Sequence, residues 1–278
     1  MVTTALAPAR PFGRTQNRFL GSVYAGNSGA VLARGFRATK SSNWIIVVSG
    51  FFEPVFYLLS MGLGLGALVG SVETTTGQQV PYAAFIAPAL LAVSAMNGAI
   101  YDSTWNVFFK MNYAKLYEGM LTTSLGPLDV ALGEIGLALC RGALYAVGFM
   151  AVMQVLGLNL AWTALLAFPA VILIAFGFAS LGMAITSYMK TFQHMDWISF
   201  VMLPMFLFSA TFYPITVYPE IVQWVVKALP LWHGVELIRG LTTGALGWGL
   251  LGHVGYYLVM IAGGLVFTTL RLKKLFLD

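Results

Sequence analysis

Six long apolar stretches, separated by short polar segments, constrain the fold of this 278-residue chain more than any other feature. A membrane-spanning helix needs about 20 predominantly apolar residues, because the hydrocarbon core of a bilayer is about 30 Å thick. Hydrophobic residues make up 59% of the sequence and charged residues only 9%, whereas soluble domains carry about 25% charged residues. We therefore predict an all-α integral membrane protein with six spans, at residues 44–69, 82–109, 128–158, 162–189, 197–212 and 247–270.

The placement of lysine and arginine predicts the orientation of these spans. An even number of spans leaves both termini on one side of the membrane, and cytoplasmic loops carry an excess of Lys and Arg. Six of the fifteen Lys and Arg residues precede the first expected span and three follow the last, whereas only Lys227 and Arg239 fall in the loops on the other side. Both termini are therefore expected in the cytoplasm. The net charge of +5 is explained by this excess of basic residues on the expected cytoplasmic side, so it does not indicate binding to nucleic acid.

The residues before the first span divide into two parts. Residues 1–28 show neither hydrophobic periodicity nor the apolar core of a signal peptide, so we expect a loose cytoplasmic tail. In residues 29–41, Arg34, Arg37 and Lys40 recur at every third position among apolar residues. This spacing predicts a helix that lies in the headgroup layer with its cations toward anionic lipid. Residues 29–278 would then form a single transmembrane domain.

The segment at residues 112–125, between the second and third expected spans, is too polar to sit in lipid. Its apolar residues recur at helical spacing and predict a short amphipathic helix. We expect Asn112 to cap the start of this helix and Gly126-Pro127 to end it. The spacing alone allows two roles. The helix can rest on lipid headgroups, which spacing alone favours, or it can insert into a cytoplasmic partner as a lever.

Residues 213–243, before the last span, are interrupted by three prolines and are too polar to cross the membrane. Their periodicity predicts two short re-entrant helices on the outer side. His233, Glu236 and Arg239 follow one another at steps of three and should face water or a cavity, because unsatisfied polar groups are costly in lipid. A metal or proton site at His233 and Glu236 is the alternative. A structural polar stripe is favoured, because no further cluster of metal ligands accompanies them.

Charged residues inside the expected spans are functional candidates, because a charge is costly within the bilayer. We expect Arg141 to pair with Glu53 or Asp102 across two helices. Ion pairs that fix helix packing are favoured over a proton relay, which stays open as the alternative. The intramembrane charged residues are Glu53, Asp102, Glu134 and Arg141.

Two further groups of residues allow more than one role. Overlapping GxxxG steps permit close helix packing, either within one subunit or between two copies; they are formed by Gly62, Gly66 and Gly70. Four aromatic residues either line a path for sugar or acyl chains or anchor the spans at the membrane interface; they are Tyr57, Tyr101, Trp105 and Phe109. The single cysteine, Cys140, excludes an intrachain disulfide and a metal cluster built on thiolates.

The order of these elements resembles the membrane subunit of type-2 ABC exporters, the family of polysaccharide, drug and nodulation-factor export permeases. The shared features are a basic interfacial helix, six spans, an amphipathic helix after the second span and a proline-broken segment before the sixth. The most specific stretches read PMFLFSATFYP at residues 204–214, LPLWH at 229–233 and ELIRG at 236–240. The EPVFY stretch at residues 53–57 resembles the nodulation-factor branch most.

The resemblance implies a homodimer or a paralogous heterodimer of permeases on two separate ABC ATPase subunits, in the inner membrane of a bacterium. ATP and Mg would bind to the ATPases, since this chain has no G-x-x-x-x-G-K-[ST] motif. No cofactor, metal or catalytic residue is expected in the chain itself. In the family, the helix after the second span is the coupling helix that sits in a cleft of the ATPase, which reverses the preference drawn from spacing. The implied contact residues are Tyr113, Lys115, Leu116, Tyr117, Glu118 and Met120.

The expected function is that of a permease subunit that moves an amphiphilic substrate out of the cytoplasm or the inner leaflet. The resemblance implies a lipid-linked saccharide, a glycolipid or a hydrophobic drug as substrate. A self-contained ion- or proton-coupled carrier or channel is the main alternative, and it would use the intramembrane charges. A membrane-embedded enzyme finds no support, because no His, Asp and Glu cluster lies at catalytic spacing.

Overall fold

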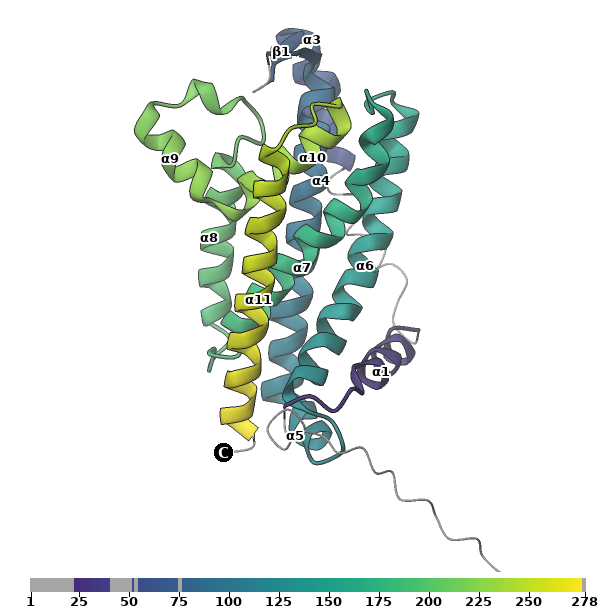
Figure 1. The fold of residues 1–278 in the computed structure, drawn as a ribbon, viewed down its shortest axis with the longest axis vertical. Coiled ribbons are helices and arrows are strands. Elements are labelled where there is room, and N and C mark those ends of the chain that lie inside the picture. Colours follow the sequence, from purple (N-terminus) through teal and green to yellow (C-terminus); the bar gives the residue numbers. More distant parts are fainter. Residues whose placement is uncertain (1–22, 41–51, 53–54, 75–76, 277–278) are drawn as a thin grey trace, which may run out of the picture.

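The computed structural model describes residues 23–40, 52, 55–74 and 77–276, which form an elongated bundle of helices aligned with the long axis of the molecule (Figure 1). Four helical stretches are long and apolar enough to cross a membrane: Tyr82–Tyr113, Pro127–Val155, Trp162–Thr186 and Gly249–Phe276. Two shorter apolar helices cover Val55–Val69 and His194–Phe208. The predicted helical membrane fold is therefore present, and four of the six expected spans meet the length criterion in the described part of the chain.

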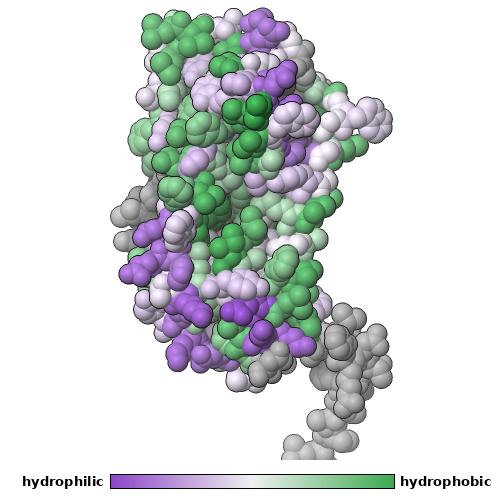
Figure 2. Space-filling model, turned by 90° about the vertical axis from the view of Figure 1, so that its left-hand side faces the viewer, coloured by the Kyte–Doolittle hydropathy of each residue, from purple (hydrophilic) through white to green (hydrophobic). Residues whose placement is uncertain are grey.

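Helix α4 (Tyr82–Tyr101) lies at the centre of the bundle. Nearly all of its side chains are buried, including Phe85, Leu90 and Met96. It packs against α6 (Pro127–Val155), α7 (Ala167–Thr186) and α10 (Pro230–Thr243). Helix α11 (Gly249–Phe276) packs along α7. The most buried of the four long helical stretches thus supplies the core, while the surrounding helices expose apolar side chains outward. Figure 2 shows hydrophilic side chains gathered at the lower end of one face, beneath a mainly apolar surface.

The second membrane helix runs beyond its expected end at residue 109. After α4 it continues through two π-helical segments, η2 (Asp102–Asn106) and η3 (Phe109–Tyr113). Asn112 therefore lies inside this helix, where its side-chain Nδ2 donates to the carbonyl of Phe108 at 3.3 Å. The prediction that Asn112 caps the next helix is wrong. That helix, α5 (Leu116–Leu121), begins after Lys115, which turns the chain with a φ of 46°.

The remaining helices follow the expected order. Helix α1 (Ser28–Lys40) packs against α6 near its N-terminal end (Figure 1). The polar segment after the fourth span leads to α8 (His194–Phe208). The predicted pair of short helices is present as α9 (Glu220–Ala228) and α10, after the short turn η5 (Ile215–Val217). Pro127 is the first residue of α6, where a missing N–H leaves no helical bond unmade.

The region between the first two spans departs from a purely helical fold. Strands β1 (Ser71–Glu73) and β2 (Gln79–Pro81) form an antiparallel hairpin in which Val72 lies opposite Val80. The π-helix η1 (Ser60–Leu65) and the short helix α3 (Gly66–Val69) precede the hairpin. Elsewhere, the helix η4 (Trp162–Leu166) leads into α7. At the position of the hairpin, the sequence predicted only a polar turn. The difference arises because Val72 and Val80 can share one apolar side of a two-stranded ribbon.

Close contact between α7 and α11 depends on a glycine, which generates the first prediction. A Cβ at Gly264 would lie 2.6–2.8 Å from backbone and side-chain atoms of Ser180, whereas a Cβ at Gly263 meets nothing within 4 Å. Gly264→Ala should therefore lower the free energy of unfolding by about 1–3 kcal/mol through overpacking. Gly263→Ala, the matched control, should raise it by up to about 1 kcal/mol. Thermal unfolding of the purified protein in detergent compares the two, and equal shifts would contradict this packing.

Candidate functional site

Helix α5 hangs below the bundle, beside the start of α6 (Figure 1). It presents an outer face and an inner face, because its residues alternate between exposure and burial. Lys115, at its start, and Glu118 are exposed, and Tyr113 just before it has 64% of its surface exposed. Tyr117 and Met120 are buried. The expected contact residues are therefore divided, since the sequence pattern identified an amphipathic helix but could not tell which partner its apolar face meets. Leu116, the remaining expected contact, is half-buried.

Tyr117 is the residue by which α5 enters the bundle. Its side chain is fully buried, and its hydroxyl has no hydrogen-bond partner among the described residues. Burial raises the pKa of Tyr117 well above its ordinary value, and the nearby Glu134 carboxylate raises it further. The phenol is therefore neutral, and the carboxylate of Glu134 is close enough for any shift of α5 to change its surroundings.

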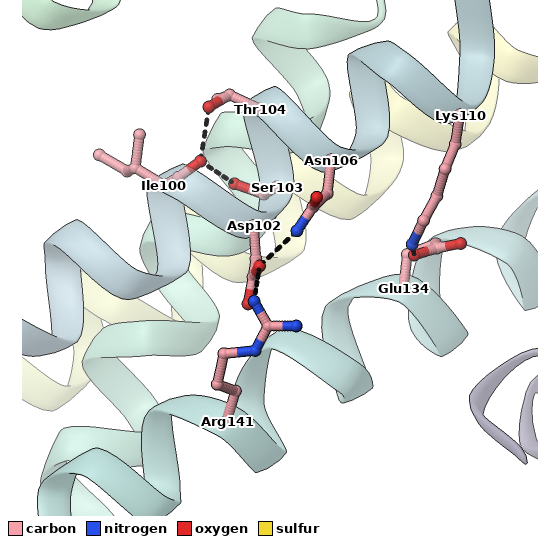
Figure 3. Close-up of polar contacts among 8 residues, drawn as sticks. All are labelled: Ile100, Asp102, Ser103, Thr104, Asn106, Lys110, Glu134 and Arg141. Carbon is pink, nitrogen blue, oxygen red and sulfur yellow. Dashed lines mark hydrogen bonds and ion pairs between the residues drawn. The ribbon is translucent and has the colours of Figure 1, made fainter. Parts of the chain in front are cut away.

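Glu134 joins three elements near the lower end of the bundle. Its Oε2 lies 2.5 Å from Nζ of Lys110 in the second membrane helix, as Figure 3 shows. Its Oε1 lies 3.5 Å from Nη2 of Arg34 in α1. The carboxyl side chain is only 5% exposed, so the two cations offset much of the cost of burying it. The sequence identified Glu134 as an intramembrane acid but did not identify Lys110 and Arg34 as its partners.

A second ion pair lies deeper in the same helix pair. Nη1 of Arg141 contacts Oδ1 of Asp102 at 2.7 Å, and Nδ2 of Asn106 donates to the same oxygen at 2.6 Å (Figure 3). Of the two expected partners of Arg141, the structure therefore shows Asp102, while Glu53 lies outside the described residues. The two pairs have opposite polarity along the helices, which fixes their antiparallel register. Both carboxylates are bound to cations, as structural ion pairs require.

The end of the bundle opposite α5 contains a buried arginine. Arg239 is 3% exposed, donates from Nη1 to Oε1 of Glu236 at 2.6 Å and from Nη2 to the carbonyl of Ala210 at 2.9 Å, and lies over the ring of Phe85. Arg239 also lines a cavity of about 200 Å³ together with Glu236 and His253, which is one of the two environments predicted for this polar stripe, water or a cavity. Its guanidinium links α10 to α4 and to the turn after α8.

His233 has a partner that the sequence did not reveal. Its Nδ1 lies 2.7 Å from Nδ1 of His253 in α11. Burial, followed by the neighbouring His253, lowers the pKa of His233 to about 4, so its ring is neutral near pH 7. The part of the chain that the structure describes contains no group of three His, Cys, Asp or Glu residues placed to hold a metal ion. The arrangement is thus a pair of edge-to-face, hydrogen-bonded rings between two helices.

A pocket of about 380 Å³ opens between the first span, the second membrane helix and α8. Three of the four aromatic residues singled out in the sequence, Tyr57, Tyr101 and Trp105, line it together with Asn97 and Ser199. The rings of Tyr101 and Trp105 are stacked, with centroids 6.2 Å apart. Phe109, the fourth, stacks on Tyr113 instead. The pocket is mainly apolar with a few polar groups, a composition typical of sites for amphiphilic ligands.

The Asp102–Arg141 pair generates the second prediction. Arg141→Asp should destabilise the fold by about 3–5 kcal/mol, because it leaves Asp102 buried beside a second negative charge. Combining it with Asp102→Arg should recover at least half of the loss, because the pair is restored with its polarity reversed. Heating followed by size-exclusion chromatography measures the folded fraction. Arg141→Asp combined with Glu134→Arg is the control, and its recovery to the same extent would contradict a specific pair.

Comparison with known proteins agrees with this arrangement. The family model described as ABC-2 type transporter matches residues 28–242. Nodulation protein J of Rhizobium leguminosarum bv. viciae is 30% identical over 88% of this chain and 93% of its own length. Nodulation protein J of Sinorhizobium fredii is 32% identical over 81% of this chain and 84% of its own length. The chain thus belongs to the ABC-2 type transporter family, whose members are multi-pass membrane permeases that work as transport subunits with an ABC ATPase.

Proposed function

We propose that this chain is the permease half of an ATP-driven exporter in a bacterial inner membrane, with both termini in the cytoplasm. Two permease copies, identical or paralogous, would sit on two ABC ATPase subunits that bind ATP and Mg. The observation that carries the proposal is the division of α5 into an exposed polar face and a buried Tyr117 beside Glu134. A partner bound to the exposed face of such a helix can displace it, and the buried tyrosine can transmit this displacement to the bundle.

The proposed coupling step follows from how α5 is attached. Lys115 and Glu118 offer one positive and one negative group to the ATPase surface. ATP binding would draw the two ATPases together and displace α5, and Tyr117 would carry this displacement to the bundle. Because Glu134 binds both Lys110 and Arg34, the second membrane helix, α6 and α1 would tilt as one rigid unit. The second ion pair keeps the two long helices in register during this motion.

The pocket lined by Tyr57, Tyr101 and Trp105 is the proposed substrate path. Aromatic and aliphatic side chains suit an acyl chain or the apolar faces of a sugar, and Asn97 and Ser199 can hydrogen-bond to a polar head. These features support an amphiphilic cargo, namely a lipid-linked saccharide, a glycolipid or a hydrophobic drug.

The face formed by the first span and α8 is the proposed contact with the second permease copy. Only Met195 and Met205 of α8 are buried, whereas Trp197 and Phe200 are 67% and 70% exposed. Gly62 packs against Ala83 of the same chain, but a Cβ at Gly66 would meet nothing within 4 Å among the described residues. A small residue next to open space permits a close approach by another helix.

The third prediction concerns the exposed charges of α5. Exchanging the charges with Lys115→Glu and Glu118→Lys should reduce export by about tenfold or more, equivalent to the ~1.4 kcal/mol of a lost interface contact. Thermal stability should not change, because both side chains are exposed. Export and ATP hydrolysis are measured in vesicles that contain the co-purified ATPase. Glu220→Lys, which alters an exposed charge of α9 at the other end, is the control. Normal export by the exchanged variant would contradict the assignment.

The fourth prediction concerns the pocket. Trp105→Ala should lower the stimulation of ATP hydrolysis by amphiphiles by several-fold, because the ligand loses the contact area of an aromatic ring. Basal hydrolysis should remain, since the Trp105 ring contacts the rings of Tyr101 and Phe192 and no residue of α5 is among the described residues that line the pocket. Trp248→Ala, which removes an 89% exposed tryptophan outside the pocket, is the control. Testing a glycolipid, a lipid-linked saccharide and a hydrophobic drug separately identifies the cargo class, and equal effects of both variants would exclude the pocket as the path.

A further inference from the structure

Asp129 is a fully buried carboxylate that neither the sequence pattern nor the proposed coupling step accounts for. It lies in the first turn of α6 and accepts hydrogen bonds from three backbone N–H groups. Oδ2 accepts from Ala25 at 2.7 Å and from Gly126 at 2.9 Å, and Oδ1 accepts from Asn27 at 2.8 Å. Hydrogen bonds to an ionised acceptor are stronger than neutral ones. Asp129 therefore does more than cap its own helix, because two of its three donors come from the chain ahead of α1.

The same stretch of chain makes further contacts with the turn between α5 and α6. The N–H of Leu128 donates to the carbonyl of Val23 at 3.1 Å. The side-chain amide of Asn27 donates to the carbonyl of Ser124 at 3.3 Å. A Cβ at Gly126 would overlap the backbone of Val23, so only glycine allows these two segments of the chain to lie this close. Residues 23–27 are thus held against the α5–α6 turn by hydrogen bonds and by a close backbone approach at Gly126.

This arrangement places further exposed groups next to the turn that follows α5. Tyr24 is 40% exposed, and Gly26 and Asn27 are exposed as well. Helix α5 has only six residues, and isolated helices this short are unstable in water. Its orientation must therefore come from its surroundings, of which residues 23–27 are a fixed part. An exposed tyrosine on a rigid backbone is a residue type enriched at the centre of protein interfaces.

We propose that residues 23–27 and α5 form one composite docking surface for the ABC ATPase, and that Asp129 is the positioning residue that holds its two parts together. The inference rests on the proposed function, because it takes the ATPase as the partner of α5. The ATPase is the occupant, because Tyr24 is exposed on a segment that is hydrogen-bonded to the residues directly after α5, the helix on which Lys115 and Glu118 are exposed. Tyr24 would contact the ATPase directly, while Asp129 would act only through the backbone that it holds.

Photo-crosslinking in intact cells tests the contact. A benzophenone amino acid replaces Tyr24, Tyr113 or Tyr213 one at a time; Tyr213 is the control, because it is 37% exposed at the opposite end of the molecule. We expect positions 24 and 113, but not 213, to give an adduct whose peptides contain the G-x-x-x-x-G-K-[ST] motif of an ATPase. An adduct from position 113 without one from 24, or a lipid adduct alone from 24, would overturn the inference and leave the proposed function intact. Failure of both positions, or an ATPase adduct from 213, would overturn both.

A pair of aspartate variants tests the role of Asp129. In Asp129→Asn, one oxygen is replaced by an NH₂ group, which cannot accept from the backbone N–H groups on that side. We expect the adduct from position 24 to fall at least fivefold while the adduct from position 113 stays. Asp196→Asn, which removes the same charge from an exposed position in the first turn of α8, should leave both adducts unchanged. An equal fall at both positions would make Asp129 a merely structural residue, and no fall at either would show that it is not needed; each result overturns its positioning role.

Discussion

The cost of placing a carboxylate among apolar helices governs the half of this structure that carries α5. A buried charge is tolerated only where a partner of opposite charge and further hydrogen bonds accompany it. Glu134 meets this demand with one cation from α1 and one from the end of the second membrane helix. Three elements that are distant in sequence must therefore stay together, because separating any of them would leave a charge unpaired. The position of α5 follows, since Tyr117 packs beside this same carboxylate.

The second membrane helix satisfies this demand by changing its helical geometry. Asp102 begins one π-helical segment and Lys110 lies in the next, and these are the two residues that pair with α6. A π-helical turn is wider than an α-helical turn, and such turns are common at functional positions. The two segments allow both side chains to reach α6 from one helix. They also carry the helix on to Tyr113, which leaves only two residues before α5 and so ties α5 closely to the span.

The elements that could be predicted from the sequence are those that depend on local spacing. Apolar length located the four long helices, the arginine spacing located α1, and prolines located α9 and α10. Contacts that depend on the meeting of distant segments could not be predicted in this way. Lys110 looked like a flanking charge because its partner lies 24 residues away. Asp129 could have been noticed as an acid in the third position of a helix that starts with proline, but its bonds to residues 25 and 27 are tertiary.

Arg239 shows that a correct local pattern leaves the partners of a side chain open. The steps of three between His233, Glu236 and Arg239 do place them along one side of α10, as predicted. The cost of an unsatisfied charge in lipid can, however, be met by backbone carbonyls and an aromatic ring as well as by water. Arg239 takes this second solution and thereby fixes the end of the bundle opposite α5 to the central helix α4. That end is thus held by an arginine buried in the core, whereas the end that carries α5 is held by ion pairs whose cations are partly exposed. Because the carboxylate of Glu134 is itself buried, losing either cation would be costly, so these pairs keep α1, α6 and the second membrane helix together at the end that carries α5.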